Sequence, residues 1–182
     1  VGSAGESSLA CTVGGSYNFI HSTFANFWNN GIRSLPAVLV NNFFTYTNGN
    51  GQEITETRDL MAANFVNCII DGNNNIEFLP DRVDGSIFNF SVSNSMIKFN
   101  DVSNTLSEIP EVDFDNTSRY QNILLNGVSH FRNTSLNDFI IGQDSEAINL
   151  GNTSGANRVP KDILEVTRIP NPDAGAYQHI EF

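Results

Sequence analysis

One short pattern occurs four times in the chain and constrains the fold more than any other feature. Each copy places a small or polar residue between positions that are mostly aliphatic or aromatic, and successive copies start roughly 20 to 27 residues apart. The four copies are Ile20–Phe24, Val40–Phe44, Val66–Ile70 and Ser93–Ile97. A pattern that recurs at this spacing is typical of chains that wind into stacked coils, each packed on its neighbours. The sequence therefore predicts stacked β-coils.

Side chains alternate along a strand, so every position of the pattern is expected to face either the core or the outside. Three columns are expected inside, with like residues stacked about 4.8 Å apart: Ile20/Val40/Val66/Ser93, Ser22/Asn42/Cys68/Ser95 and Phe24/Phe44/Ile70/Ile97. The polar column His21/Asn41/Asn67/Asn94 is expected to face water. The remaining column, Thr23/Phe43/Ile69/Met96, is mostly apolar, so we expect a long loop to cover it; the alternative is a contact with another molecule.

Composition and charge narrow the function classes. A net charge of -11 with only nine Lys and Arg disfavours binding to a phosphate backbone, so no nucleic-acid partner is expected. No run of 18 apolar residues occurs, so no membrane span is expected. Cys11 and Cys68 are too few for a disulfide framework, and Cys68 is expected to act as a small apolar residue. The chain holds 26 Asn, which fits turns and ladders because Asn tolerates left-handed backbone.

The length of 182 residues favours a single domain over 1–182, in three parts. Residues 1–16 are expected to form an irregular lead-in segment, 17–135 the stacked coils, and 136–182 the last coil and a C-terminal cap. The strongest turn signal is Asn48-Gly49-Asn50-Gly51, and we expect a loop over 53–63, with one helical turn as the alternative. We interpret the chain as a piece of a longer protein whose own upstream coils would stack on it.

The C-terminal part carries an ordered set of short motifs: Leu136–Ile141, Ser145–Gly151, Asp162, Arg168 and Pro172–Gln178. Over about 45 residues this set resembles the ending of the pectate-lyase-like superfamily of bacterial proteins, whose members often close with D-F-x-L, S-P-A-I-D-x-G, D-x-x-G-x-x-R and D-I-G-A-Y-E. The departures are Glu146, Asn149, Ala174 and Gln178. The resemblance implies a right-handed single-stranded parallel β-helix of about five to six coils with a C-terminal capping segment. We also expect Asp173 and Arg168 to pair.

Two groups of residues are candidates for binding. The aromatic residues Trp28, Phe43 and Tyr46 are expected to point outward and to stack on sugar rings. Asp81, Arg82 and Asp84 follow Pro80 and form a charged group that is a second candidate, with solvated loop charges as the alternative explanation.

The spacing of Asp71, Asn73 and Asn75 is similar to the start of a calcium loop, in which oxygen ligands two residues apart converge on one ion. Ile76 stands where such a loop has Gly, and chance is the alternative explanation in a chain this rich in Asn. No cofactor other than calcium is indicated, and none of the motifs G-x-S-x-G, H-E-x-x-H and C-x-x-C occurs. The sequence identifies no catalytic residue.

The sequence is compatible with three functions. The first is a non-catalytic module, secreted, periplasmic or on the bacterial outer surface as the resemblance implies, that binds polysaccharide or another surface component. The second is the C-terminal part of a polysaccharide lyase or glycoside hydrolase whose active site lies largely upstream. The third is a structural spacer or adhesin stalk. Two carboxyl groups and a basic residue meeting in one outward groove would favour the enzyme.

Overall fold

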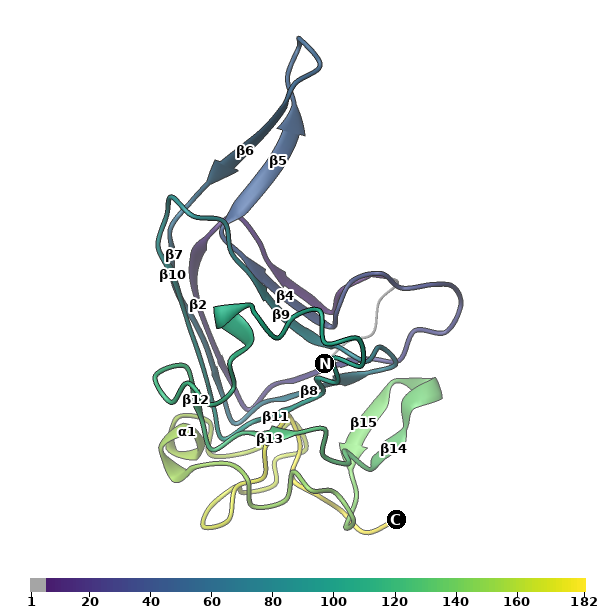
Figure 1. Cartoon of the computed structure of the whole chain (residues 1–182). Coiled ribbons are helices and arrows are strands. Elements are labelled where there is room, and N and C mark those ends of the chain that lie inside the picture. The colour runs from purple at the N-terminus through teal and green to yellow at the C-terminus, as the bar shows by residue number, and fades with distance from the viewer. Residues whose placement is uncertain (1–5) are drawn as a thin grey trace.

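The protein is built mainly of β-strands, most of which form three parallel sheets (Figure 1). The computed structural model describes residues 6–182. The first sheet contains β1 (Leu9–Cys11), β4 (Val38–Asn41) and β9 (Phe78–Asp81). The second sheet contains β2 (Gly15–Ile20), β7 (Leu60–Val66), β10 (Phe88–Ser93) and β12 (Tyr120–Gln121). The third sheet contains β3 (Thr23–Asn26), β8 (Ile69–Gly72), β11 (Met96–Ile97) and β13 (Leu124–Leu125). The prediction of an all-β fold is confirmed.

The chain visits the three sheets in a repeating order, so that strands from successive coils lie side by side. Three copies of the recurring pattern stack in register, as predicted: Ile20–Phe24, Val66–Ile70 and Ser93–Ile97. The second copy was misassigned, because Val40 pairs with Cys11 and Pro80 in the first sheet. The longest sheets have four strands each, so the described residues form fewer than the five to six coils expected.

The corner between the second and third sheets corrects the expected sidedness of the pattern. His21, Asn67, Asn94 and Asn122 occupy this corner on successive coils, with φ of 48°, 56°, 49° and 49°. Left-handed backbone breaks the two-residue alternation, so positions before the corner are on the opposite face from the one predicted. Val66 therefore lies outside the core and next to Gly155, and the expected inward column Ile20/Val66/Ser93 is wrong. The residues after the corner were predicted correctly, since Cys68, Ile70 and Ile97 belong to the core.

The core is aromatic and is enclosed by the three sheets. Phe65 lies at its centre, with ring centroids 5.0 Å from Phe19 and 5.7 Å from Phe78. The polar residue Ser95 is tolerated inside because its hydroxyl accepts a hydrogen bond of 2.9 Å from the Cys68 N–H and donates one of 2.8 Å to the Ser93 carbonyl. Cys68 is a free, fully buried thiol, as predicted.

An antiparallel hairpin projects from the body between the first and second sheets (Figure 1). It is formed by β5 (Phe43–Thr47) and β6 (Glu53–Thr57). The turn at 48–51 is confirmed, because the Asn48 side chain accepts hydrogen bonds from the N–H groups of Asn50 and Gln52. The loop expected over 53–63 is wrong: β6 and β7 occupy most of it. Alternating Glu, Ile and Thr are compatible with a strand once a partner is available.

Two further segments close the structure. The loop after β11 contains η1 (Pro110–Val112), and its Phe114 packs against Phe99 and Tyr120 with centroids 4.9 and 4.7 Å away. This loop therefore covers one end of the core. Beyond β13 the chain forms β14 (Phe131–Asn133), η2 (Thr134–Leu136), β15 (Asp138–Ile141) and α1 (Thr153–Arg158).

Residues 142–182, here called the C-terminal segment, lie against the outside of the third sheet. Ala147 and Ala174 of this segment pack on Ile69 and Met96, so the prediction that the apolar outer column is covered by a loop is confirmed for these residues. The expected last coil is not formed, because β15 pairs antiparallel with β14. The segment also buries His21 and Asn67, which were expected to face water.

The start of the described chain is more regular than expected. Of the predicted lead-in segment 1–16, residues 1–5 lie outside the described residues, and Leu9–Cys11 forms β1 in the first sheet. Among residues 6–182, no helix has the length and apolar character needed to cross a membrane.

Candidate functional site

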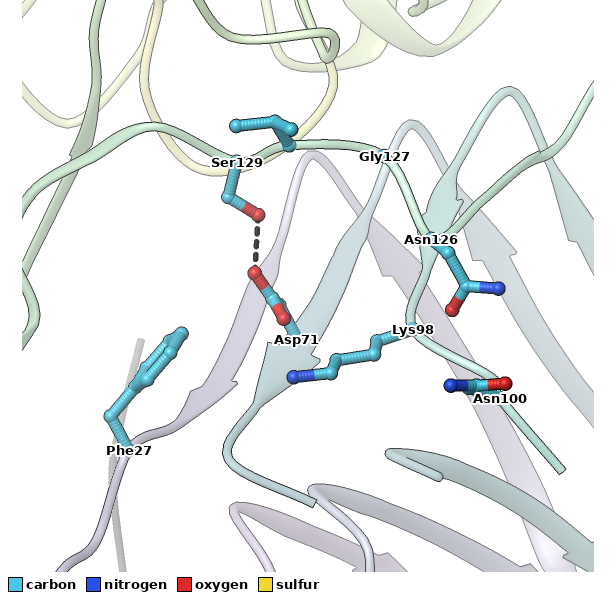
Figure 2. A pocket seen from close by; sticks show the side chains of 8 residues that line it. Phe27, Asp71, Lys98, Asn100, Asn126, Gly127 and Ser129 are labelled. Atoms are coloured by element: carbon cyan, nitrogen blue, oxygen red, sulfur yellow. Dashed lines mark hydrogen bonds between the residues drawn. The ribbon is translucent and has the colours of Figure 1, made fainter. Parts of the chain in front are cut away.

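A groove of about 550 Å³ lies where the strands of the third sheet end (Figure 2). Ile70, Ile97 and Leu125 are paired neighbours in that sheet. The next residue on each strand therefore follows the same register, and these residues are Asp71, Lys98 and Asn126. All three line this groove, which we call the Asp71 groove; Phe27 and Ser129 form other parts of its wall.

Hydrogen bonds hold the polar groups of the Asp71 groove in place. The Ser129 hydroxyl donates to one carboxylate oxygen of Asp71 at 2.5 Å, and the Gly72 N–H donates to the other at 2.7 Å. The Lys98 ammonium donates to the Gly72 carbonyl. The Asn126 amide binds both backbone groups of Phe99 at 2.9 Å. The groove thus presents an oriented carboxylate, an ammonium group and amides beside an aromatic wall.

A smaller hollow of about 150 Å³ shares Phe27 with the Asp71 groove. We call it the Trp28 hollow. Its remaining lining residues are Trp28, Asn29, Asn30, Thr134, Ser135 and Asn137. The Phe27 ring packs on Phe131 and Phe139 at 5.9 and 6.0 Å, so the wall between the two sites is fixed. Trp28 is 37% exposed, and the hollow combines its ring with amide and hydroxyl groups.

The loop that carries Trp28 is anchored by a buried ion pair. Arg33 and Glu77 have side chains that are only 2% and 0% exposed, and both guanidinium NH2 groups bind the Glu77 carboxylate. The same carboxylate accepts hydrogen bonds of 2.7 Å from the N–H groups of Ala37 and Asn74. Every partner of Glu77 is a donor, so this site requires a carboxylate.

Two of the three charged candidates lie in a separate groove of about 390 Å³, which we call the Asp81 groove. Asp81 and Arg82 line it together with Glu108 and Glu111. Burial raises the pKa of Asp81. Glu111 is almost fully buried and is flanked by the guanidinium groups of Arg82 and Arg119 at 3.5 and 3.4 Å.

The other predicted residues are dispersed. Asp84 contacts Arg82, and its side chain is 88% exposed. It does not line the Asp81 groove. Phe43 and Tyr46 are on β5 of the hairpin. The Tyr46 ring stacks on Phe44 with centroids 5.7 Å apart, and its hydroxyl donates to Glu56 at 3.1 Å.

The three calcium candidates do not meet in one hollow. Asp71 lines the Asp71 groove, where Ser129 and Gly72 already occupy its oxygens. The Asn73 amide donates to the Trp28 carbonyl at 3.1 Å, and Asn75 lines a different hollow. Within residues 6–182, no group of three or more His, Cys, Asp or Glu side chains is arranged to hold a metal ion. Calcium binding here stays a prediction that lacks a suitable arrangement of ligands.

Several residues of these sites were missed by sequence reasoning. Lys98 carries a signal that was available, because Asp71 and Lys98 each follow a copy of the recurring pattern by one residue. Ser129 carries none, since it reaches its site from an irregular segment 58 residues away from Asp71 in the chain. In comparisons with known proteins, the chain matches no protein-family model, no curated protein and no solved structure.

Proposed function

We propose that this chain is a non-catalytic module that binds polysaccharide through the Trp28 hollow and the adjoining Asp71 groove. The observation that carries the proposal is the half-exposed Trp28 ring beside a hollow lined by Asn, Thr and Ser side chains. A ring offers an apolar face to a sugar, and amides supply both donors and acceptors for its hydroxyl groups. Concave sites with an aromatic surface and a few fixed polar groups are the usual form of ligand sites.

The scaffold in this proposal is a right-handed single-stranded parallel β-helix. Its support is the repeated visit of the chain to three parallel sheets and the shared left-handed corner on successive coils. Right-handedness follows from a general rule, because crossovers between parallel strands of one sheet are right-handed in almost all known cases. The C-terminal motifs resemble those of the pectate-lyase-like superfamily, which also supports a right-handed parallel β-helix. The same resemblance supports a secreted, periplasmic or bacterial surface location.

We infer that the ligand is an uncharged glycan. Asp71 and Lys98 supply one charge of each sign, so the Asp71 groove has no local excess of positive charge to attract a polyanion. The net charge of -11 on the chain repels polyanions at long range. Hydroxyl groups of a neutral sugar suit both partners, since Asp71 accepts hydrogen bonds and Lys98 donates them.

Trp28 gives a direct test, because it is the only Trp in the chain. A glycan array first identifies the neutral polysaccharides that bind. The protein is then titrated with fragments of each of these polysaccharides, and binding is followed by Trp28 fluorescence. We expect a saturable change in emission and a loss of at least tenfold in affinity for Trp28→Ala and for Asn137→Ala. Tyr46→Ala, on the distant hairpin, is the matched control and should bind normally. Absence of binding to every neutral glycan, or equal binding by Trp28→Ala, would refute this function.

A second candidate is a polysaccharide-cleaving enzyme, and the Asp81 groove favours it. Asp81, with a raised pKa, and the buried Glu111 lie in one outward groove with Arg82. Two carboxyl groups in one groove, in different surroundings, are the arrangement used in general acid and base catalysis of glycoside cleavage. Release of reducing ends from a bound polysaccharide, abolished by Asp81→Asn and by Glu111→Gln, would establish this activity in place of simple binding. A spacer or stalk, the third candidate, requires neither site.

A further inference from the structure

The corner column His21, Asn67, Asn94 and Asn122 contains one residue that can change its charge. All four residues have left-handed backbone, which Asn adopts readily and His less so. Asn would therefore satisfy the backbone at position 21 as it does on the other three coils. The choice of an imidazole at this corner calls for another explanation.

His21 is enclosed by the C-terminal segment and is only 5% exposed. Its Nε2 is 2.8 Å from the side-chain nitrogen of Asn67, while its Nδ1 is buried without a hydrogen-bond partner among residues 6–182. Burial lowers the pKa of His21 to about 4, and the positive charge of Arg168 contributes in the same direction. Backbone groups of Gly175 and Asp173 oppose this shift without cancelling it. The ring is therefore neutral in the closed structure at neutral pH.

The charged groups facing His21 come from the C-terminal segment. Arg168 is 2% exposed and donates to the Ala176 carbonyl at 2.9 Å and to Gln178 at 3.3 Å. It forms no ion pair with Asp173, contrary to the sequence prediction; Asp173 instead accepts hydrogen bonds from the backbone and ring of His179. Asp162 and Asp173 both favour the charged form of Arg168. A proton on His21 would thus place a second buried positive charge near a guanidinium group that is already desolvated.

The hydrogen bonds that fasten the segment are made at the same corner. The Gly175 N–H donates to the Asn67 carbonyl at 2.8 Å, and the Ala176 N–H donates to the Thr23 hydroxyl at 2.9 Å. The Asn152 N–H donates to the Asn67 side chain at 2.9 Å. A positive charge on the His21 ring would therefore lie at the place where the C-terminal segment is attached to the first two coils.

We propose that His21 is an acid-sensitive latch: it holds the C-terminal segment on the third sheet while neutral and favours its release when protonated. Release exposes the apolar column of Thr23, Ile69 and Met96, which the segment covers. In the released state the His21 ring is in water and binds a proton near its ordinary pKa. Because the released state binds the proton more tightly than the closed state, lowering the pH shifts the equilibrium toward release.

Hydrogen exchange of the whole chain measures this equilibrium. With pKa values of about 6.5 in the open state and about 4 in the closed state, the opening constant should rise about 30-fold between pH 7.5 and pH 5. After correction for intrinsic exchange rates, we expect this loss of protection at the amides of Gly175 and Ala176. Amides of β7 and β10 in the core should change much less.

His21→Asn is the matched variant, because it reproduces the residue found on the other three coils. We expect its segment amides to exchange with no such dependence on pH, whereas His179→Asn should keep the dependence of the natural chain. NMR titration of the His21 ring gives a second readout that does not depend on the variant folding. An unchanged 30-fold rise in His21→Asn, the absence of a rise in the natural chain, or titration of the folded His21 ring near pH 6.5 would each overturn the latch.

Discussion

Replacing Glu77 with Gln should be among the most damaging conservative changes in this protein. The Glu77 side chain is completely buried, and its two oxygens receive hydrogen bonds from Arg33, Ala37 and Asn74. Gln keeps the shape of the side chain, but its NH2 group must face one of these donors. The substitution also leaves the charge of Arg33 buried without its counterion.

The expected loss follows from both effects. Removing one partner of a buried ion pair costs about 3–5 kcal/mol of unfolding free energy, because the remaining charge stays desolvated. The exposed pair of Arg58 and Glu56 gives a matched comparison: its oxygen and nitrogen are 2.9 Å apart, yet the side chains are 56% and 38% exposed. Glu56→Gln should therefore cost less than about 1 kcal/mol.

Urea unfolding, followed by circular dichroism and by Trp28 fluorescence, measures both costs. The double variant Arg33→Met/Glu77→Gln should recover part of the loss, since no uncompensated charge remains. Glu77→Gln should also weaken glycan binding, because Arg33 anchors the loop that forms the Trp28 hollow. If the unfolding free energy of Glu77→Gln lies within about 1 kcal/mol of that of the natural chain, the buried ion pair does not hold this loop and the reasoning fails.

Two further predictions concern buried groups. Burial raises the pKa of Cys68 to about 12 and that of Cys11 to about 11, so neither thiol should react with a disulfide reagent at pH 8 until the chain is denatured; rapid labelling of the native protein would contradict this. Gly175→Ala should destabilise the chain by about 1–3 kcal/mol in thermal unfolding, because φ is +95° and a Cβ would lie 2.7 Å from Ile69. Gly49→Ala, with nothing within 4 Å, should be close to neutral, and equal effects of the two would show that the contact with Ile69 is unimportant.

The sequence contained enough information to predict the stacking of three coils and the covering of their apolar outer column. Both depend on a pattern that repeats in register, and Ile69 and Met96 occur in equivalent places on adjacent coils. The abundance of Asn was also interpreted correctly, since left-handed positions are occupied by Asn67 and Asn94 at the corner. The pattern did not predict the left-handed corner. Side chains alternate between the two faces only while the backbone stays extended, so the faces of the residues before the corner were predicted wrongly.

Other features depend on tertiary context that a local pattern does not carry. The copy Val40–Phe44 matches the pattern found at the corner between the second and third sheets, but Val40 belongs to the first sheet, because strands of any sheet around a shared core need similar residues. The candidate sites show the same limit. Asp71 and Ser129 are 58 residues apart and meet only because the chain returns to this edge after β13. Their contact follows from the path of the loop, which no periodicity specifies.

The corner residues have two roles, one that depends on the backbone conformation and one that depends on the side chain. A matched pair of substitutions separates these two roles. Asn67→Gly and Asn122→Gly both preserve left-handed backbone, since Gly adopts positive φ without strain. The buried Asn67 side chain bonds His21 at 2.8 Å and both backbone groups of Asn152 at 2.9 Å, whereas the exposed Asn122 side chain has no hydrogen bond to any described residue. At about 1 kcal/mol for each bond, Asn67→Gly should lower the unfolding free energy by about 2–4 kcal/mol and Asn122→Gly by less than 1. Equal losses in urea unfolding would mean that Asn is needed at the corner only for its backbone, and that the Asn67 side chain does not help to hold the C-terminal segment.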